Sequence, residues 1–447
     1  MSRTPSRRDV LKGAGVVAGL QLLSPVIFRA GEAWGATQVD PLAADRYRLI
    51  VIDMHGGNDG LNTVVPMSGS IRDVYEKVRV TTELPVSGLN PLGAVNGGTV
   101  GLHGALSTVY DLWNQNRVAI VQGADYPSHN YSHFVSDDIW QSGLPGQRPG
   151  SGWLGRHLDR TGIDDGELRG IGIGGRLPLA LRGEIEMGEQ VNALSETQFA
   201  DGAATTGSAG KRHLAFAGYD ADTRAVRDFY GDYCRTALGV ATSTTGLTAA
   251  QPGGVANAML TARTLLTANL GCEVVFVLAG GYDTHDNQLS RHNTLLTDLD
   301  RGIEAFYYGT KGGVPVTTGN PAVPVGPVDP HLASRTLIMT FSEFGRRIGD
   351  NGTGTDHGAA GPMFLIGPPA PAAGSGAPVL NPGLHRDHPD LGTVTLPKDN
   401  LAGTTDIRSV YQSVLTRWLA DEGEAGFVVS GTGIDGDGTL TGLFGTA

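Results

Sequence analysis

The sequence predicts an α/β fold with a largely parallel central sheet covered by helices on both faces. Short apolar runs rich in Val, Ile and Leu recur along the chain, which is typical of strands buried on both faces. Segments with apolar residues at helical spacing separate these runs, and this alternation favours parallel strand pairing. With 447 residues and 40% hydrophobic residues, the chain can bury a substantial core.

The strands and helices follow from this alternation of patterns. The predicted strands are residues 47–53, 118–121, 273–278, 336–341 and 363–366. Helical spacing is present over 102–113, 254–270, 288–307 and 405–420. Stretches rich in Gly, Pro or Ser are predicted as connections, and these are residues 142–152, 199–212, 309–333 and 367–383.

The N-terminal residues indicate export. Ser6 to Lys12 contain paired arginines, and an apolar stretch and small residues follow, which is typical of a twin-arginine signal peptide. The apolar stretch is roughly 16 residues long, against the ~20 that a membrane span needs. The sequence therefore predicts a signal peptide over 1–36, recognition by the twin-arginine translocation machinery, and a periplasmic or extracellular location without a stable membrane span. Residues 37–447 are predicted as one domain with a helical insertion around 180–250.

Charge and cysteine content argue against two kinds of ligand, nucleic acid and a cysteine-bound metal. The formal net charge is −12 and no basic stripe is visible, which argues against nucleic-acid binding. The two cysteines, Cys234 and Cys272, lack metal-ligand spacing, and they either pair or stay as thiols.

Carboxylates and imidazoles gather around the ends of the predicted strands. In open α/β sheets, ligands bind beyond the carboxyl ends of the strands. Carboxylate oxygens and neutral imidazoles are ligands of divalent cations, so we expect one or two ions of zinc, manganese, magnesium or calcium. The candidate metal ligands are Asp59, Asp283, His285, Glu343, Asp356 and His357.

Further residues are candidates for catalysis and substrate binding. Ser132 precedes a predicted helix that begins near His133, where a helix N-terminus would stabilise an alkoxide or an anion. These two residues are the predicted catalytic residues. Asn58, Arg346 and Arg347 are the predicted substrate-binding residues, the arginines because a guanidinium binds anionic groups bidentately.

Each candidate also has a structural interpretation. Asp59 would shape a turn, Ser132 would cap a helix, and Asp283 with His285 would cap the next one. Glu343 would form a buried ion-pair network with the two arginines, and the segment at 356–357 would be a loop. His385 and His388 are further possible ligands.

Several motifs together resemble the exported bacterial family catalogued as domain of unknown function 1501. The motifs are the twin-arginine start, GGNDGLNTVVP (56–66), YSHFVSDDIWQSG (131–143), GWLGRHLD (152–159), GGYDTHDNQ (280–288), FSEFGRRIGDNGTGTDHGAAGPMFLIG (341–367) and TTDIRSVY (404–411). This resemblance covers nearly the whole mature chain. It implies an alkaline phosphatase-like or sulfatase-like fold and a metal-dependent hydrolase of phosphate or sulfate esters.

The resemblance also implies roles for particular residues. The Asp after the first strand would be Asp59 or, as the alternative, Asp53, and the nucleophile would be Ser132. Asp283 and His285 would form the next ligand pair, although they are two residues apart and the superfamily usually spaces this pair by four.

The segment around 343–357 aligns in two ways. Asp356 and His357 match the Asp-His pair by residue type. By chain order, which we favour, Glu343 replaces the Asp and His357 is the final ligand. Phe344 then stands where a His is expected, which leaves one metal site short of a ligand.

Two functions from different classes therefore remain. The first is an exported metal-dependent hydrolase that acts on a small-molecule or polymer ester through Ser132. The second is an exported non-catalytic protein that retains the fold and binds an envelope polymer or a partner protein. A carbohydrate-directed enzyme without metal is a weaker third, because histidines are frequent near the strand ends.

Overall fold

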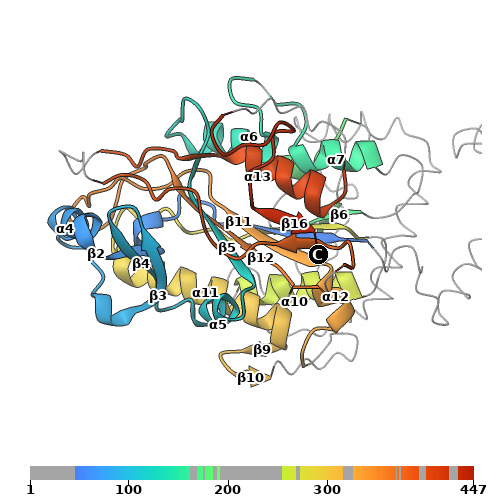
Figure 1. Ribbon diagram of the computed structural model, residues 1–447, viewed down its shortest axis with the longest axis horizontal. Coiled ribbons are helices and arrows are strands. Elements are labelled where there is room, and N and C mark those ends of the chain that lie inside the picture. Colours follow the sequence, from blue (N-terminus) through green and yellow to red (C-terminus); the bar gives the residue numbers. More distant parts are fainter. Residues whose placement is uncertain are drawn as a thin grey trace, which may run out of the picture.

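The structure is a computed structural model, and the regions that it describes are arranged around one large sheet (Figure 1). The predicted signal peptide and most of the predicted insertion at 180–250 lie outside them. No helix within these regions is long and apolar enough to cross a membrane. Cys272 is buried, whereas Cys234 lies outside the described residues. The described residues are 46–147, 149–161, 169–174, 177–184, 189–191, 254–267, 272–315, 326–368, 370–371, 374–391, 399–421 and 431–446.

The central sheet is mixed but mostly parallel. In spatial order its strands are β14 (Gly383–His385), β5 (Val118–Asp125), β12 (Gly361–Ile366), β11 (Thr336–Phe341), β1 (Arg48–Asp53), β8 (Val274–Leu278), β6 (Gly170–Ile173) and β7 (Glu189–Val191), and β15 (Thr405–Asp406) also pairs with β5. Only β12 runs antiparallel to its neighbours among these described strands. The predicted α/β class with a largely parallel sheet is confirmed.

Helices cover both faces of this sheet (Figure 1). One face carries α6 (His133–Ser142), α7 (Trp153–Thr161) and α13 (Ile407–Ser413), which continues as a π-helical turn, Val414–Trp418. The other carries α5 (Ser107–Asn114), α10 (Gly254–Thr267), α11 (Gln288–Tyr308) and the short α12 (Pro330–Ser334). Side chains of β1 alternate between the two faces: Leu49 and Val51 pack with α7 and α13, and Ile50 and Ile52 pack with α10 and α11.

The predicted strands are all present, with ends that differ by up to four residues. Two helix predictions need correction. The helix predicted over 102–113 begins only at Ser107, because Leu102 lies in β4 (Gly98–His103), and the segment 405–420 begins as a strand and ends as a π-helical turn.

Several small elements were not predicted. A second sheet contains β2 (Val64–Ser68), β4 and β3 (Leu89–Val95), next to α4 (Gly69–Val78). The predicted connections at 309–333 and 367–383 contain β9 (Thr310–Lys311), β10 (Val314–Pro315), α12 and β13 (Pro378–Leu380), which pairs with β16 (Phe444–Thr446). Single 3-10 turns are η1 (Gly60–Asn62), η2 (Val86–Gly88) and η3 (Leu179–Leu181).

The direction of β12 positions the functional site. Because β12 is antiparallel to β11 and β5, its first residue lies at the edge where those strands end. The segment that leads into β12 therefore meets the loops that follow β1, β5, β8 and β11.

Candidate metal centre

Three imidazoles and one carboxylate converge at the carboxyl edge of the sheet, and we call this group the metal cluster. It consists of His133 at the start of α6, Asp283 after β8 and His357 before β12, which lie close enough to share an ion, and of His285, which contacts Asp283. The Asp283 Oδ1 atom lies 3.0 Å from Nε2 of His285 and 3.2 Å from Nε2 of His357. The Nε2 atom of His133 lies 3.7 Å from Asp283 Oδ2.

Each imidazole in the metal cluster is held through its other nitrogen. The Nδ1 atom of His133 lies 2.7 Å from Glu343 Oε1, and Nδ1 of His285 lies 3.3 Å from Asp356 Oδ1. The Nδ1–H of His357 donates to the Tyr131 carbonyl oxygen at 2.8 Å. Acceptors at Nδ1 hold each ring as the tautomer whose Nε2 carries a lone pair, which is the arrangement of metal-binding histidines.

The electrostatics of the metal cluster also suit a cation. Burial acts to raise the pKa of Asp283, but the hydrogen bond from Arg346 lowers it to about 2, so the carboxylate stays ionised. Burial lowers the pKa of His357, which favours the neutral ring that a metal requires. The Nε2 atoms of His285 and His357 are 2.9 Å apart, and a shared cation or proton would offset the repulsion between their lone pairs.

Glu343 connects the metal cluster to the loop after β1. Its buried carboxylate accepts hydrogen bonds from the backbone N–H groups of Gly56, at 2.8 Å, and Gly57, at 3.2 Å. Both glycines have positive φ, and a Cβ at Gly56 would lie 2.3 Å from the backbone nitrogen of Asp283. The Gly-Gly pair is therefore required by close packing as well as by backbone conformation, and it fixes Glu343 against His133.

A second group of possible ligands adjoins the first. The Nδ1 atom of His55 lies 3.8 Å from Asp53 Oδ2 and 3.9 Å from oxygens of both Asp137 and Glu343. This nitrogen makes no hydrogen bond among the described residues. Asp53, His55 and Glu343 are grouped closely enough to hold a cation, which fits a site with one or two ions.

The Phe344 ring packs against two imidazoles of the metal cluster, which also contact each other. Its ring centroid lies 4.6 Å from that of His357 and 4.9 Å from that of His133. Position 344 thus supplies a ring contact and no ligand, whereas His133, which the sequence placed only among the catalytic residues, is a member of the metal cluster. In the sequence, the only signal that His133 could bind a metal was its position directly after Ser132, the possible nucleophile.

Ser132 is the N-cap residue of α6 by position, and its backbone carbonyl accepts the first hydrogen bond of the helix. Its side chain makes no capping hydrogen bond, and its backbone N–H donates to Asn130 Oδ1 at 2.8 Å. The residues on either side of Ser132 both contact the metal cluster, Tyr131 through its carbonyl and His133 as a member. The structure thus places Ser132 at the rim of the metal cluster.

Asp59 and Asn58 lie away from the metal cluster. Arg79 binds both carboxylate oxygens of Asp59, at 2.5 and 2.9 Å, and Gln288 donates a further hydrogen bond to it. Asn58 is buried and hydrogen-bonded to Thr63 and His292. The structure therefore favours the alternative, Asp53, as the acidic residue of β1 at the site. The contacts of Asn58 are with residues of the fold and not with the metal cluster.

The two predicted arginines differ. Arg346 is buried and donates to the backbone carbonyls of Gly57, at 2.6 Å, and Thr355, at 2.9 Å, as well as to Asp283 at 2.8 Å. It holds the loops together, so it is a positioning residue. The Arg347 guanidinium lies 5.0 Å from the centre of the Tyr131 ring at the rim and remains the candidate contact for an anionic group.

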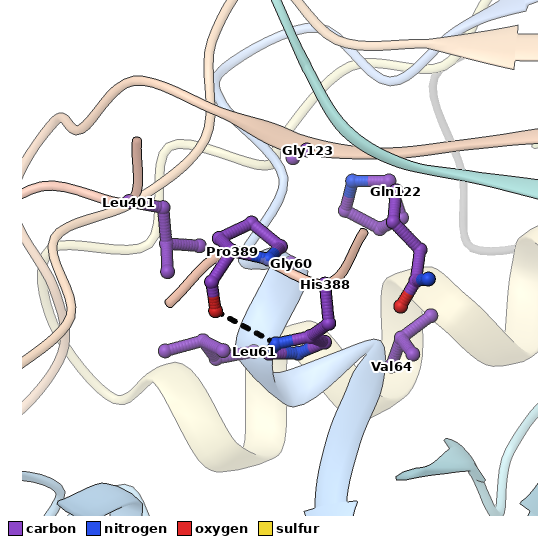
Figure 2. A pocket seen from close by; sticks show the side chains of 10 residues that line it. Gly60, Leu61, Val64, Gln122, Gly123, His388, Pro389 and Leu401 are labelled. Carbon is purple, nitrogen blue, oxygen red and sulfur yellow. Dashed lines mark hydrogen bonds between the residues drawn. The ribbon is translucent and has the colours of Figure 1, made fainter. Parts of the chain in front are cut away.

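His388, a further possible ligand in the sequence, occupies a separate pocket (Figure 2). Its Nδ1–H donates to the Pro389 carbonyl oxygen at 2.8 Å, and Leu61 and Leu401 line the pocket beside it. This space is about 20 Å³, too small for a substrate. His385 lies in β14 and its Nε2 atom is 2.8 Å from the carbonyl oxygen of Asn381. Neither histidine belongs to the metal cluster.

Comparison with known proteins gives a family match and similarities among solved structures. The model of the family described as "Protein of unknown function (DUF1501)" matches residues 116–311. The predicted family resemblance is confirmed over this stretch. Among curated proteins, no sequence matches the chain. Among solved structures, the lipoteichoic acid synthase LtaP from Listeria monocytogenes is similar, with 10% identity, a TM-score of 0.32, and coverage of 85% of this chain and 81% of that one.

Proposed function

We propose that the protein is a metal-dependent hydrolase of phosphate or sulfate esters. The observation that carries this proposal is the convergence of three imidazole Nε2 atoms around Asp283, each ring held by an acceptor at Nδ1, at the rim where Ser132 opens α6. The chain supplies imidazole nitrogen and carboxylate oxygen ligands, so its donor set fits a divalent cation. His133, Asp283, His285 and His357 would hold it.

The residues around the metal cluster support ester hydrolysis in separate ways. When bound, a divalent cation supplies Lewis-acid stabilisation of negative charge on ester oxygens. Ser132 Oγ would attack phosphorus or sulfur, the alcohol would leave with a proton, and water would then release the group from Ser132. The backbone N–H groups of the first turn of α6 point toward this end of the helix and stabilise the charge that develops there. Arg347 would contact a remaining anionic oxygen.

The first test is elemental analysis of protein purified without chelator, followed by assays with a panel of phosphate and sulfate esters. We expect one or two equivalents of a divalent metal and hydrolysis of at least one ester. Ser132→Ala should lower kcat by at least about 100-fold while the metal content stays the same. Ser290→Ala, an exposed serine near the start of α11, is the matched control. Activity that survives Ser132→Ala would exclude this nucleophile, and metal-free protein that folds and binds no added metal would refute the proposal.

Export is part of the same proposal. The paired arginines Arg7 and Arg8 support recognition by the twin-arginine translocation machinery and a periplasmic or extracellular location. Replacing both arginines by lysine should keep the protein in the cytoplasm, as measured by cell fractionation. Unchanged export of this variant would exclude the pathway.

A further inference from the structure

A cavity of about 430 Å³ opens beside the group formed by Asp53, His55 and Glu343. Its size is within the range of small-molecule sites. Asp53, His55 and Asp137 line it on one side, and Phe134, Phe276 and Leu278 supply apolar surface. The cavity is thus apolar with an acidic part, a combination that the metal cluster does not have.

A residue that lines the cavity lies close to a member of the metal cluster, since the ring centroids of His55 and His133 are 6.1 Å apart. Glu343 Oε1 lies 2.7 Å from Nδ1 of His133 and 3.9 Å from Nδ1 of His55. The apolar rim comes from the same two elements that supply ligands, since Phe134 follows His133 on α6 and Leu278 ends the strand that precedes Asp283. A ligand whose ester group lies on the metal cluster therefore has this cavity within reach of its next few atoms.

Charge defines what the cavity accepts. Asp53 and Asp137 are buried carboxylates, and no lysine or arginine of the described chain lines the cavity. His55 is the only basic side chain among the lining residues and is outnumbered by the carboxylates within 4 Å of its Nδ1 atom. A second anionic group would be repelled here, whereas a cation would be attracted.

The aromatic surface adds to this preference. Phe134 is 82% exposed, which leaves its ring accessible to a ligand. Aromatic faces attract organic cations, and methyl groups on a cation bury well against apolar walls.

We propose that this cavity binds an alkylammonium group that belongs to the alcohol part of the substrate. The proposal rests on the proposed function for the identity of the ester, but the cavity can be tested without any hydrolysis. The substrate class would be phosphate or sulfate esters of amino alcohols, with the charge facing Asp53 and Asp137 and the alkyl groups facing Phe134 and Phe276.

The test compares two alcohols of the same shape, choline and uncharged 3,3-dimethylbutan-1-ol, in titration calorimetry with the metal-loaded protein. We expect choline to bind roughly tenfold more tightly, since a cation near aromatic rings and carboxylates gains this much. Equal binding of the two alcohols, or binding of neither, would overturn the proposal, including the case in which a second metal ion neutralises the carboxylates.

Three variants refine the test. Asp137→Asn should remove the preference for choline, and Asp138→Asn, on the exposed neighbour, is its matched control. Phe134→Ala changes an exposed residue that the fold does not need, and it should weaken choline binding about fivefold. An unchanged affinity in a folded Phe134→Ala variant would overturn the aromatic contact.

Hydrolysis assays separate this proposal from the proposed function. Phosphocholine and 3,3-dimethylbutyl phosphate differ only in the charge at the distal group. Hydrolysis of both at equal kcat/KM, without choline binding, would refute the cavity assignment and leave the hydrolase intact. Selective choline binding without hydrolysis of any ester would refute the hydrolase and leave the cavity assignment intact.

Discussion

Two groups of histidines and carboxylates lie at opposite edges of the central sheet, and they use their imidazoles differently. At the amino edge, His157 is buried between Glu273, which precedes β8, and Asp421, with 2.8 Å from each ring nitrogen to a carboxylate oxygen. At the carboxyl edge, each histidine of the metal cluster uses Nδ1 for an acceptor and turns Nε2 toward Asp283.

The carboxylates of the His157 network are also fully engaged. Arg169 pairs with Glu273 and Arg160 pairs with Asp421. Although burial acts against the charged ring, the two carboxylates hold the pKa of His157 above its ordinary value. The comparison teaches that a histidine among carboxylates indicates a metal site only when one ring nitrogen remains for the metal. His157 has neither nitrogen available.

The largest expected effect is loss of metal from the carboxyl edge. The double variant Asp283→Ala, His357→Ala removes the shared carboxylate and one imidazole, so bound metal should fall below detection in elemental analysis. His331→Ala, on α12, is the control and should retain the metal. Metal retained by the double variant would show that the metal does not bind at the carboxyl edge of the sheet.

Removal of the His157 imidazole should destabilise the fold without changing metal content. His157→Ala removes the hydrogen bonds from the buried carboxylates of Glu273 and Asp421, each of which keeps its arginine, and this costs about 1.5–3 kcal/mol of unfolding free energy. His357→Ala should cost less than about 1 kcal/mol when both proteins are unfolded in urea with chelator. Similar costs for the two variants would contradict the distinction between a structural and a functional group.

The acceptors at Nδ1 should matter less than the ligands. Asp356→Asn keeps the shape but weakens the acceptor that orients His285, and we expect about a tenfold lower metal affinity. The expected loss is at the low end because the Asp356 side chain is 61% exposed, so solvent screens its charge. Asp286→Asn, on an exposed neighbour, should leave the affinity unchanged. Metal affinity is measured by competition with a chelating dye.

The smallest effect is the pH dependence of stability at the amino edge. The pKa of His157 in the folded protein is raised from its ordinary value of 6.5, so its contribution is complete below pH 6.5 and is lost as the pH rises through the raised value. When unfolding is measured with a chelator present, the difference in unfolding free energy between the wild type and His157→Gln should therefore shrink as the pH rises above 6.5. A difference that grows with pH would contradict the charged state of His157.

Much of the fold could be predicted from local patterns. The strands β1, β8 and β11 are short, mostly apolar runs without alternation, which is typical of a sheet that is covered on both faces. The second sheet was not predicted, because β3 has no fully buried residue and contains Pro91 and Gly93, which obscure a strand pattern.

Part of the candidate site was predicted, from residue type and from position along the chain. Asp283, His285, His357, Glu343 and Asp356 all take part in the metal cluster or orient it. Asp59 does not, because its partner Arg79 comes from the end of α4, in a segment whose place in the fold no local pattern gives. The proximity of His55 and Asp137 could not be predicted, because it depends on the packing of α6 against the loop after β1.

The sequence by itself determined the class of fold, the acidic balance of the chain, and the supply of imidazoles and carboxylates next to strand ends. These follow from side-chain alternation and composition, which are local properties. Only the tertiary structure decided which ring nitrogens converge and which carboxylates are neutralised by arginine. Those outcomes depend on the antiparallel course of β12 and on the order of the strands, which bring together residues as far apart as His133 and His357.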